Sequence, residues 1–411
     1  MHDKATLATP SLPQTGHDLP APVARYARRL RPVLCLDDFE AQARRHLPGP
    51  VFAYIRGGAE RNHTLSANAE AYRAHAFVTR GLVDVSARDT SLRFLGQTYA
   101  SPFGIAPLGL SALSAYRGDV VLARAAAAQH IPMAMSGSSL IPLEDVARAS
   151  PGAWFQAYLP GDPGQIEALI SRVAQAGYRT LMVTIDTPVA ANRENNVRAG
   201  FSTPLRPSLR LVAEGLAHPR WLFGTFLKTL MRHGMPHFEN NYATRGAPIL
   251  SPNVLRDFSD RGHLSWTHLS AIRRMWKGDL IVKGILHPDD ARLARDTGAD
   301  ALVVSNHGGR QLDGALASLH ALPDVARAVP GLPLLLDGGV RRGTDVLKAI
   351  ALGADGVLVG RPFAYAAAIG GHAGVCHAID LLKAEISRDM ALLGVRCLAE
   401  LRQPGILRRI S

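Results

Sequence analysis

Short, continuous apolar runs alternate with amphipathic stretches along most of the chain after Phe103. Continuous apolar runs are typical of strands that are buried on both faces, and their alternation with helical stretches predicts a parallel sheet. Eight such runs are present, at Phe103–Pro107, Ile131–Met135, Trp154–Tyr158, Thr180–Asp186, Leu280–Lys283, Ala301–Ser305, Leu334–Asp337 and Val357–Gly360.

A predicted helix follows each run, which gives eight strand–helix units. This number and the chain length favour a (β/α)8 TIM barrel over a doubly wound open sheet, which usually has fewer strands. The helical stretches are Asp119–His130, Glu144–Ser150, Pro163–Gly177, Leu264–Trp276, Pro288–Gly298, Leu319–Val329, Gly343–Gly353 and one that begins near Phe363.

One interval departs from the regular spacing. The fourth and fifth predicted strands begin about 100 residues apart, so an insertion of the chain, at about 200–262, follows strand four. Long connections in compact domains are usually functional, and this one leaves the barrel face that carries active sites. We expect a mobile N-terminal arm over residues 1–30. Residues 31–411 then form one barrel domain, which begins with a helical leader.

Composition excludes several classes of protein. Of the 411 residues, 47% are hydrophobic, yet no apolar run reaches the roughly 18 residues that a membrane-spanning helix needs. The three cysteines are far apart, which argues against a disulfide framework and suits a cytoplasmic protein. The net charge of +12 favours an anionic partner. Because the charges are scattered and no nucleic-acid-binding module is present, we expect no nucleic acid partner.

Polar and charged residues collect at the predicted carboxyl ends of the strands, which together form the mouth of a barrel. The segment S-N-H-G-G-R-Q-L-D follows strand six and carries His307 and Arg310, a base that titrates near neutral pH and a carboxylate-binding fork. Such strand ends are typical of catalytic sites in barrels. Other strand ends contribute Asp186 and Arg193, Gln156 and Tyr158, and Lys283.

The last two strands predict a phosphate site. The segment D-G-G-V-R-R-G follows strand seven from Asp337, and Gly360-Arg361 follows strand eight. Glycine N–H groups at a helix N-terminus bind phosphate at these two loops in many barrels, and arginines add charge-assisted hydrogen bonds. The sequence has no G-x-x-x-x-G-K-[ST], G-x-G-x-x-G or H-E-x-x-H segment, so we expect neither a P-loop, a Rossmann site nor a catalytic metal.

These segments resemble the FMN-dependent L-2-hydroxy acid oxidases and dehydrogenases, which include glycolate oxidase, mandelate dehydrogenase and flavin-type lactate dehydrogenase. The resemblance lies in S-N-H-G-G-R-Q-L-D, in V-K-G before it and in D-G-G-V-R-R-G-T-D-V-L-K-A-I-A-L-G-A after it, and it covers about residues 33–400. It implies a TIM barrel with FMN at its mouth, which agrees with the strand count.

The resemblance also implies roles for individual residues. His307 is the expected active-site base, and Asp186 stabilises its imidazolium. Arg193 and Arg310 are expected to bind the substrate carboxylate, and Lys283 to face the flavin N1/O2 edge, where it stabilises the reduced anionic flavin.

The remaining implied contacts are to substrate and cofactor. Tyr54 and Tyr158 are expected to hydrogen-bond the substrate. FMN is expected to contact Pro107, Ser136, Gln156, Thr184, Lys283, Ser305, Asp337, Gly339, Arg341, Gly360 and Arg361.

Two positions bear on substrate size. Gly109 stands where short-chain oxidases carry alanine, and Ser138 stands at a position that is bulky in those enzymes. Both open the pocket, so a lactate- or mandelate-like acid, with a side chain as large as an aromatic ring, is expected.

Residues 201–236 combine basic with aromatic and apolar side chains, as an interfacial membrane segment does. A surface helix packed on the barrel or on another subunit is the alternative. Together with the resemblance, this segment predicts a peripheral enzyme on the cytoplasmic face of the inner membrane, which passes electrons to quinone. A soluble oxidase that reduces O2 to H2O2 is the alternative. The resemblance further implies a homotetramer or a multiple of it.

Overall fold

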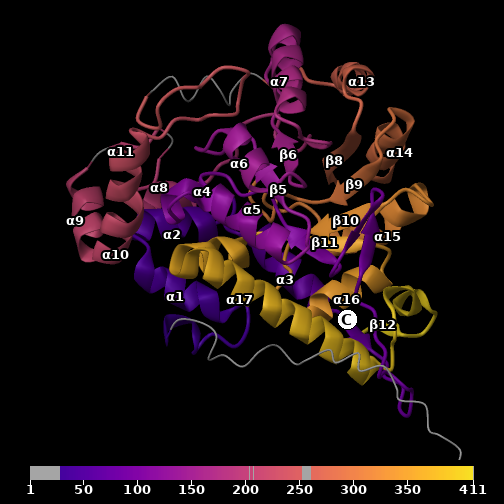
Figure 1. The fold of residues 1–411 in the computed structure, drawn as a ribbon. Helices are drawn as coiled ribbons and strands as arrows, with labels where there is room; N and C mark the ends of the chain where they lie inside the picture. The colour runs from indigo at the N-terminus through magenta and orange to yellow at the C-terminus, as the bar shows by residue number, and fades with distance from the viewer. Residues whose placement is uncertain (1–27, 203, 207, 252–260, 411) are drawn as a thin grey trace, which may run out of the picture.

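A computed structural model describes residues 28–202, 204–206, 208–251 and 261–410. Its centre is a parallel sheet of eight strands in the order β4-β11-β10-β9-β8-β7-β6-β5. A further parallel bridge between Ile105 and Met133 brings the two edge strands together, so the sheet curls into a nearly closed barrel (Figure 1). The predicted (β/α)8 fold is therefore confirmed, and the open-sheet alternative was wrong. The strands are β4 (Phe103–Ile105), β5 (Ala134–Ser136), β6 (Trp154–Ala157), β7 (Thr180–Thr184), β8 (Asp279–Ile285), β9 (Ala301–Val304), β10 (Leu334–Asp337) and β11 (Gly356–Val359).

The barrel interior is filled by a small apolar cluster of its own. Met182, Ile281 and Leu335 from three strands are fully buried there. A hairpin of β2 (Leu92–Phe94) and β3 (Gln97–Tyr99) adds side chains to the same cluster at the end where the strands begin. That end is therefore packed closed, and the open mouth lies at the carboxyl ends of the strands.

Helices surround the barrel where the sequence predicts them. Each packs its apolar stripe on the outer face of the strands, which makes one continuous core. The last helix is kinked at Gly371, whose backbone is not helical. These helices are α5 (Gly118–Ala128), α6 (Leu143–Ala149), α7 (Pro163–Gln175), α13 (Trp266–Met275), α14 (Pro288–Asp296), α15 (Ser318–Ala328), α16 (Gly343–Ala351) and α17 (Arg361–Leu393).

The leader before the barrel is helical and covers one side of its mouth. It comprises η2 (Arg28–Leu30), α1 (Asp38–His46), α2 (Gly49–Arg56) and α3 (His63–Arg73). After α3, β1 (His75–Phe77) pairs antiparallel with the final strand, β12 (Leu407–Arg409). Apart from the turn of η2, the predicted N-terminal arm lies outside the described residues.

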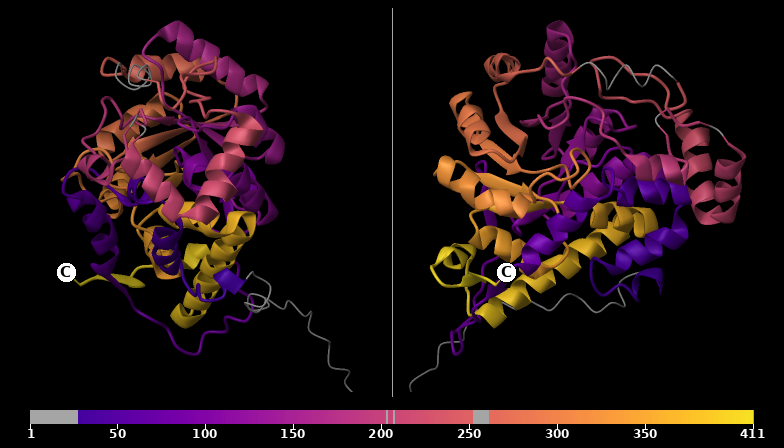
Figure 2. Two further views of the ribbon diagram at one scale, coloured as in Figure 1. Left: turned by 90° about the vertical axis from the view of Figure 1, so that its left-hand side faces the viewer. Right: turned by 180° about the vertical axis from the view of Figure 1, so that it is seen from behind.

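The connection between β7 and β8 contains a helical insertion at one edge of the molecule (Figure 2). Trp221 fastens this insertion to the barrel, because its indole N–H donates to the carbonyl of Leu113 at 2.7 Å. Within the insertion its ring stacks on Phe226. Within the described residues, no helix combines the length and hydropathy needed to cross a membrane. The insertion contains α8 (Glu194–Ala199), α9 (Leu209–Ala217), α10 (Pro219–Trp221), the π-helical turn η3 (Leu222–Leu227) and α11 (Lys228–His233), with α4 (Ser111–Ser114) beneath it.

Candidate active site

A cavity of about 490 Å³ opens at the carboxyl ends of the strands. It extends from the strand ends to the leader helix α2 and to the insertion, so three parts of the chain contribute to its wall. Asp186, Ser136, Gln156 and Ser305 lie behind the surface of the cavity. The other predicted site residues line it directly: Tyr54, Pro107, Tyr158, Thr184, Arg193, Lys283, His307, Arg310, Asp337, Gly339, Arg341, Gly360 and Arg361.

His307, which lines the cavity, forms a pair with Asp186, which lies behind it. Nδ1 of His307 lies 3.0 Å from Oδ1 of Asp186, and Nε2 lies 3.2 Å from the hydroxyl of Tyr158. The carboxylate therefore fixes the orientation of the imidazole and leaves Nε2 directed at the phenol. This is the arrangement of a general base with an orienting acid.

Burial and charge set the protonation of this pair. Burial lowers the pKa of His307, and the attraction of Asp186 offsets only part of this effect. Burial tends to raise the pKa of Asp186, but the neighbouring His307 and Lys283 outweigh it and hold that pKa below its usual range. Burial also raises the pKa of the Tyr158 phenol to about 12. At neutral pH the site thus contains a neutral imidazole, a carboxylate and a neutral phenol.

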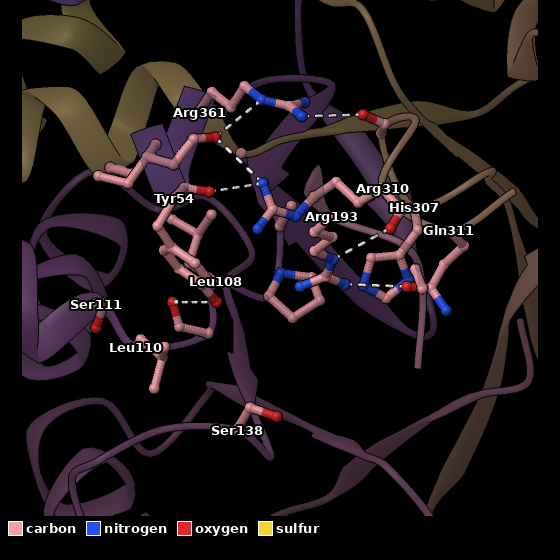
Figure 3. Close-up of a pocket in the computed structure, with 18 of the residues that line it drawn as sticks. Tyr54, Leu108, Leu110, Ser111, Ser138, Arg193, His307, Arg310, Gln311 and Arg361 are labelled. Carbon is pink, nitrogen blue, oxygen red and sulfur yellow. Dashed lines mark hydrogen bonds between the residues drawn. The ribbon is translucent and has the colours of Figure 1, made fainter. Parts of the chain in front are cut away.

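Two arginines flank the base (Figure 3). Arg193 donates to the carbonyl of Arg310 at 3.2 Å and to Oε1 of Gln311 at 3.0 Å. Arg310 lies over the ring of Tyr54, 5.0 Å from its centroid, and donates to backbone carbonyls at the end of α2. Burial, together with the charge of Arg193, lowers the pKa of Arg310 to about 10. Two adjacent guanidinium groups in a buried cavity favour a bound carboxylate.

Lys283 lies deeper in the barrel. Its ammonium forms an ion pair of 2.9 Å with Asp337 and donates to the hydroxyl of Ser305 at 2.8 Å. Burial tends to lower the pKa of Lys283, but Asp337 and Asp186 outweigh it and raise that pKa, so the side chain is cationic. A fixed positive charge therefore lies at the floor of the cavity.

Arg361 and the loop after β10 also line the cavity. Arg361 donates to the carbonyls of Ile55 and Gly57, and burial lowers its pKa to about 9. Gly339 has a φ of +81°, and a Cβ there would lie 2.2 Å from the carbonyl oxygen of Asn68. Only glycine fits this turn, whose backbone lines the cavity and is free to meet an anion.

Buried polar atoms without hydrogen-bond partners lie at the carboxyl ends of β6 and β7. Among the described residues, Nε2 of Gln156 and Oγ1 of Thr184 are buried and have no hydrogen-bond partner. The amide oxygen of Gln156 accepts from Ser136 at 3.2 Å, which fixes the free nitrogen in place. Unsatisfied buried groups are costly, so a donor and an acceptor held in this way suit a polar ring that supplies the missing bonds.

Several residues of the site were missed by the sequence reasoning. Gln311 joins Arg193 to the backbone carbonyl of Asp186, and its signal was its place in the same nine-residue segment as His307. Asn68 of the leader hydrogen-bonds Asn306 behind the base, and nothing local in the sequence indicates this contact. Arg261 is buried and lies over the ring of Tyr158, and its position at the end of the insertion gave no signal.

A barrel whose mouth combines an imidazole–carboxylate pair, two neighbouring arginines, a buried cation and a glycine turn has the groups that a flavin-linked oxidoreductase needs. The model of the FMN-dependent dehydrogenase family matches residues 43–409, and the chain belongs to that family. It is an FMN-dependent oxidoreductase, and the resemblance seen in the sequence is confirmed.

The similar proteins agree with this assignment. The chain is 41% identical to an L-lactate dehydrogenase of Stenotrophomonas maltophilia (strain R551-3), over 90% of this chain and 97% of that one. An L-lactate dehydrogenase of Xanthomonas campestris pv. campestris (strain 8004) is 42% identical over 90% and 96%. Among solved structures, a monotopic membrane (S)-mandelate dehydrogenase matches with a TM-score of 0.84 and 34% identity, covering 92% of this chain and all of that one. A mandelate oxidase matches with a TM-score of 0.74 and 32% identity, over 91% and 98%.

The residues present fit FMN. The unpartnered atoms of Gln156 and Thr184 suit the polar edge of the flavin ring, and the turn at Gly339 with Arg361 suits the phosphate. Lys283 supplies a cation between them. In the part of the chain that the structure describes, no group of three His, Cys, Asp or Glu side chains could hold a metal ion.

Proposed function

We propose that the protein oxidises an L-2-hydroxy acid to the 2-oxo acid with FMN as the cofactor. The observation that carries the proposal is the His307–Asp186 pair, with a contact of 3.0 Å, in a cavity that also holds Arg193 and Arg310. The similar proteins named as L-lactate dehydrogenases and a mandelate dehydrogenase support the same substrate class.

Each side chain has a defined task in this proposal. Arg193 and Arg310 hold the carboxylate of the substrate, which places its α-carbon beside His307. Tyr54 and Tyr158 hydrogen-bond the substrate. Nε2 of His307 accepts a proton from the substrate, and Asp186 stabilises the imidazolium that results. Bound FMN supplies an acceptor for two electrons.

The cofactor contacts complete the proposal. Lys283 holds positive charge at the flavin, and Asp337 and Ser305 hold Lys283 in place. The proposed ring contacts are Pro107, Ser136, Gln156 and Thr184, and the proposed ribityl and phosphate contacts are Asp337, Gly339, Arg341, Gly360 and Arg361.

Anaerobic reduction tests the substrate class. The purified FMN-loaded protein is mixed without oxygen with L-2-hydroxy acids that range from glycolate to mandelate, and the flavin absorbance is followed. We expect rapid bleaching by at least one L acid and none by its D enantiomer. If no L acid bleaches the flavin of a protein that holds FMN, the proposal is wrong.

The structure supports a large substrate side chain. A Cβ at Gly109 would lie 3.1 Å from the hydroxyl of Tyr54 and 3.4 Å from Cβ of Ser138. The contact with Tyr54 is tighter than ordinary packing, so a side chain at this position would crowd the cavity beside Tyr54 and Ser138. We therefore include acids of the size of mandelate in the proposed substrate class.

We propose quinone as the electron acceptor and the cytoplasmic face of the inner membrane as the location. The insertion supports this, since it exposes Leu209, Phe223 and Met231 among basic side chains that include Arg220 and Arg232. Such a surface suits an acidic bilayer. A solved structure that is similar along its whole length is named a monotopic membrane protein.

Product analysis separates this acceptor from the alternative. We expect fast turnover with a quinone analogue and little H2O2 during aerobic turnover. Stoichiometric H2O2 would instead establish the soluble oxidase. We also propose a homotetramer or a multiple of it without a nucleic acid partner, and light scattering in detergent gives the number of subunits.

A further inference from the structure

The catalytic loop after β9 has an uncommon backbone. His307, Gly308 and Gly309 have φ values of +59°, +63° and +72°, so three consecutive residues are left-handed. Glycine accepts this conformation readily, whereas histidine adopts it at a cost in free energy. A left-handed histidine persists only where surrounding contacts impose it. Surrounding residues must therefore hold this turn.

Two side chains within the loop hold it from inside. The hydroxyl of Ser305 accepts from the backbone N–H of His307 at 3.0 Å. The side-chain oxygen of Asn306 accepts from the N–H of Gly309 at 3.1 Å, and the backbone oxygen of Asn306 accepts from the same group. The side-chain amide of Asn306 thus spans the turn. The position of the turn therefore depends on the position of that amide.

Asn68 of the leader helix α3 holds the amide of Asn306. Nδ2 of each residue donates to Oδ1 of the other, and both distances are 2.8 Å. Oδ1 of Asn68 also accepts from the N–H of Ser318 at 3.2 Å. Asn68 is 1% exposed and Asn306 is 5% exposed, so water cannot replace either bond easily.

The first turn of α3 and the residues just before it lie beside the catalytic loop. The carboxylate of Asp313 accepts from the N–H groups of Thr64 at 2.8 Å and Arg61 at 3.1 Å. The N–H of Ala59 donates to the carbonyl of Gly309 at 2.8 Å. The leader and the catalytic loop therefore pack as one unit, although they are about 240 residues apart in the sequence.

We propose that Asn68 is a positioning residue for the reaction. By fixing Asn306 it maintains the left-handed turn, and the turn directs the imidazole of His307 at Asp186 and at the substrate. Asn68 lies behind the base and acts only through it. The inference rests on the proposed function, because it takes His307 to be the base.

The variant Asn68→Ala tests the proposal in the FMN-loaded protein. We expect kcat per bound flavin to fall roughly 10- to 100-fold, the scale for a misplaced catalytic group. The KM for the 2-hydroxy acid should change by less than about threefold, because the guanidinium of Arg310 is held separately by the carbonyls of Tyr54 and Gly57. The deuterium isotope effect on the α-hydrogen should rise, since bond cleavage becomes more strongly rate-limiting.

Asn240→Ala is the matched control. Asn240 is also 1% exposed and makes two buried hydrogen bonds, with the N–H of Leu143 and the carbonyl of Ile141, but it does not contact the catalytic loop. We expect it to lower Tm while kcat per bound flavin and the isotope effect stay unchanged. Asn68→Asp is measured in parallel, because it keeps the volume and the acceptor but replaces the donor to Asn306 with a carboxyl oxygen. It should give an intermediate fall in kcat.

A double-mutant comparison shows whether Asn68 acts through Asn306. Asn306→Ala should lower kcat as Asn68→Ala does, and the double variant should be no worse than either single variant. Effects that multiply would overturn the proposal, and so would an unchanged kcat per bound flavin in Asn68→Ala and Asn68→Asp.

His307→Ala is included so that a failure of the proposed function can be told from a failure of the positioning role. If His307→Ala still reduces the flavin at the parent rate, the proposed function is wrong. If His307→Ala is slow but the Asn68 variants reduce the flavin at the parent rate, only the positioning role is wrong.

Discussion

Lys283 of β8 and Asp337 at the end of β10 form an ion pair of 2.9 Å, and both side chains are almost fully buried. Charges in such a place are expensive unless they compensate each other, and removing one leaves the other unpaired. Lys283→Met should therefore lower the free energy of unfolding by about 3–5 kcal/mol, measured by urea unfolding. Lys283→Met with Asp337→Asn is the control, and it should recover part of the loss. Equal stability of the parent and Lys283→Met would contradict the pairing.

Replacement of the base should separate chemistry from cofactor binding. In His307→Ala, we expect flavin reduction by the substrate to slow by about 10²- to 10⁴-fold, the usual contribution of a general base. The protein should stay yellow, because the proposed FMN contacts lie on other residues. Stopped-flow absorbance gives the rate, and the flavin absorbance of the purified protein gives the occupancy. Loss of both together would show that His307 serves binding instead.

The pH dependence of kcat/KM follows from the environment of His307. Only the neutral imidazole can accept a proton, so the rate falls as the pH falls through the pKa of His307. Burial lowers that pKa, and the midpoint of the acid limb should therefore lie below pH 6.5. The attraction of Asp186 raises the same pKa, so Asp186→Asn should move the acid limb to still lower pH while it reduces kcat. An acid limb that moves upward in Asp186→Asn would contradict this electrostatic account.

Gly109→Ala should change the preference for substrate size. The added methyl group would approach the Tyr54 hydroxyl to 3.1 Å and narrow the side-chain end of the cavity. A mismatch of one methyl group is worth about 1–3 kcal/mol, so the ratio of kcat/KM for mandelate to that for lactate should fall at least about tenfold. Gly152→Ala is a suitable control, since a Cβ there meets nothing within 4 Å. An unchanged ratio would place the substrate side chain elsewhere.

Point substitutions test membrane contact better than a deletion, because removal of 205–232 would also remove Trp221. That residue is 5% exposed and bonded to Leu113, so it belongs to the packing of the barrel and not to the lipid-facing surface expected from the sequence. Phe223→Asp with Met231→Asp should reduce co-sedimentation with vesicles rich in acidic lipid and leave dye reduction unchanged. Leu293→Asp, at an exposed leucine on α14, is the control. Undiminished sedimentation of the double variant would argue against the insertion as the anchor.

The sequence was sufficient to predict the strands, because a strand buried on both faces has a continuous apolar signature. It also predicted that Asp186 and His307 lie at the same mouth, since every parallel strand presents its carboxyl end there. The contacts of the leader were not predictable in this way. Asn68 meets Asn306, and Arg361 meets Ile55, through tertiary packing that has no local periodicity. Trp221 lies within residues 201–236, which were expected to face lipid, because an aromatic among basic residues looks alike whether it faces lipid or the barrel.

The carbonyl groups at the end of α2 limit which fragments of this enzyme could be active. Arg310 and Arg361 both donate to its last carbonyls, at Tyr54, Ile55 and Gly57, where the negative end of the helix dipole lies. A fragment that starts at β4 would keep all eight barrel strands and yet leave two half-buried guanidinium groups without these acceptors. The barrel alone is therefore not an independent catalytic unit, and fragment complementation would have to supply residues 49–57 in trans.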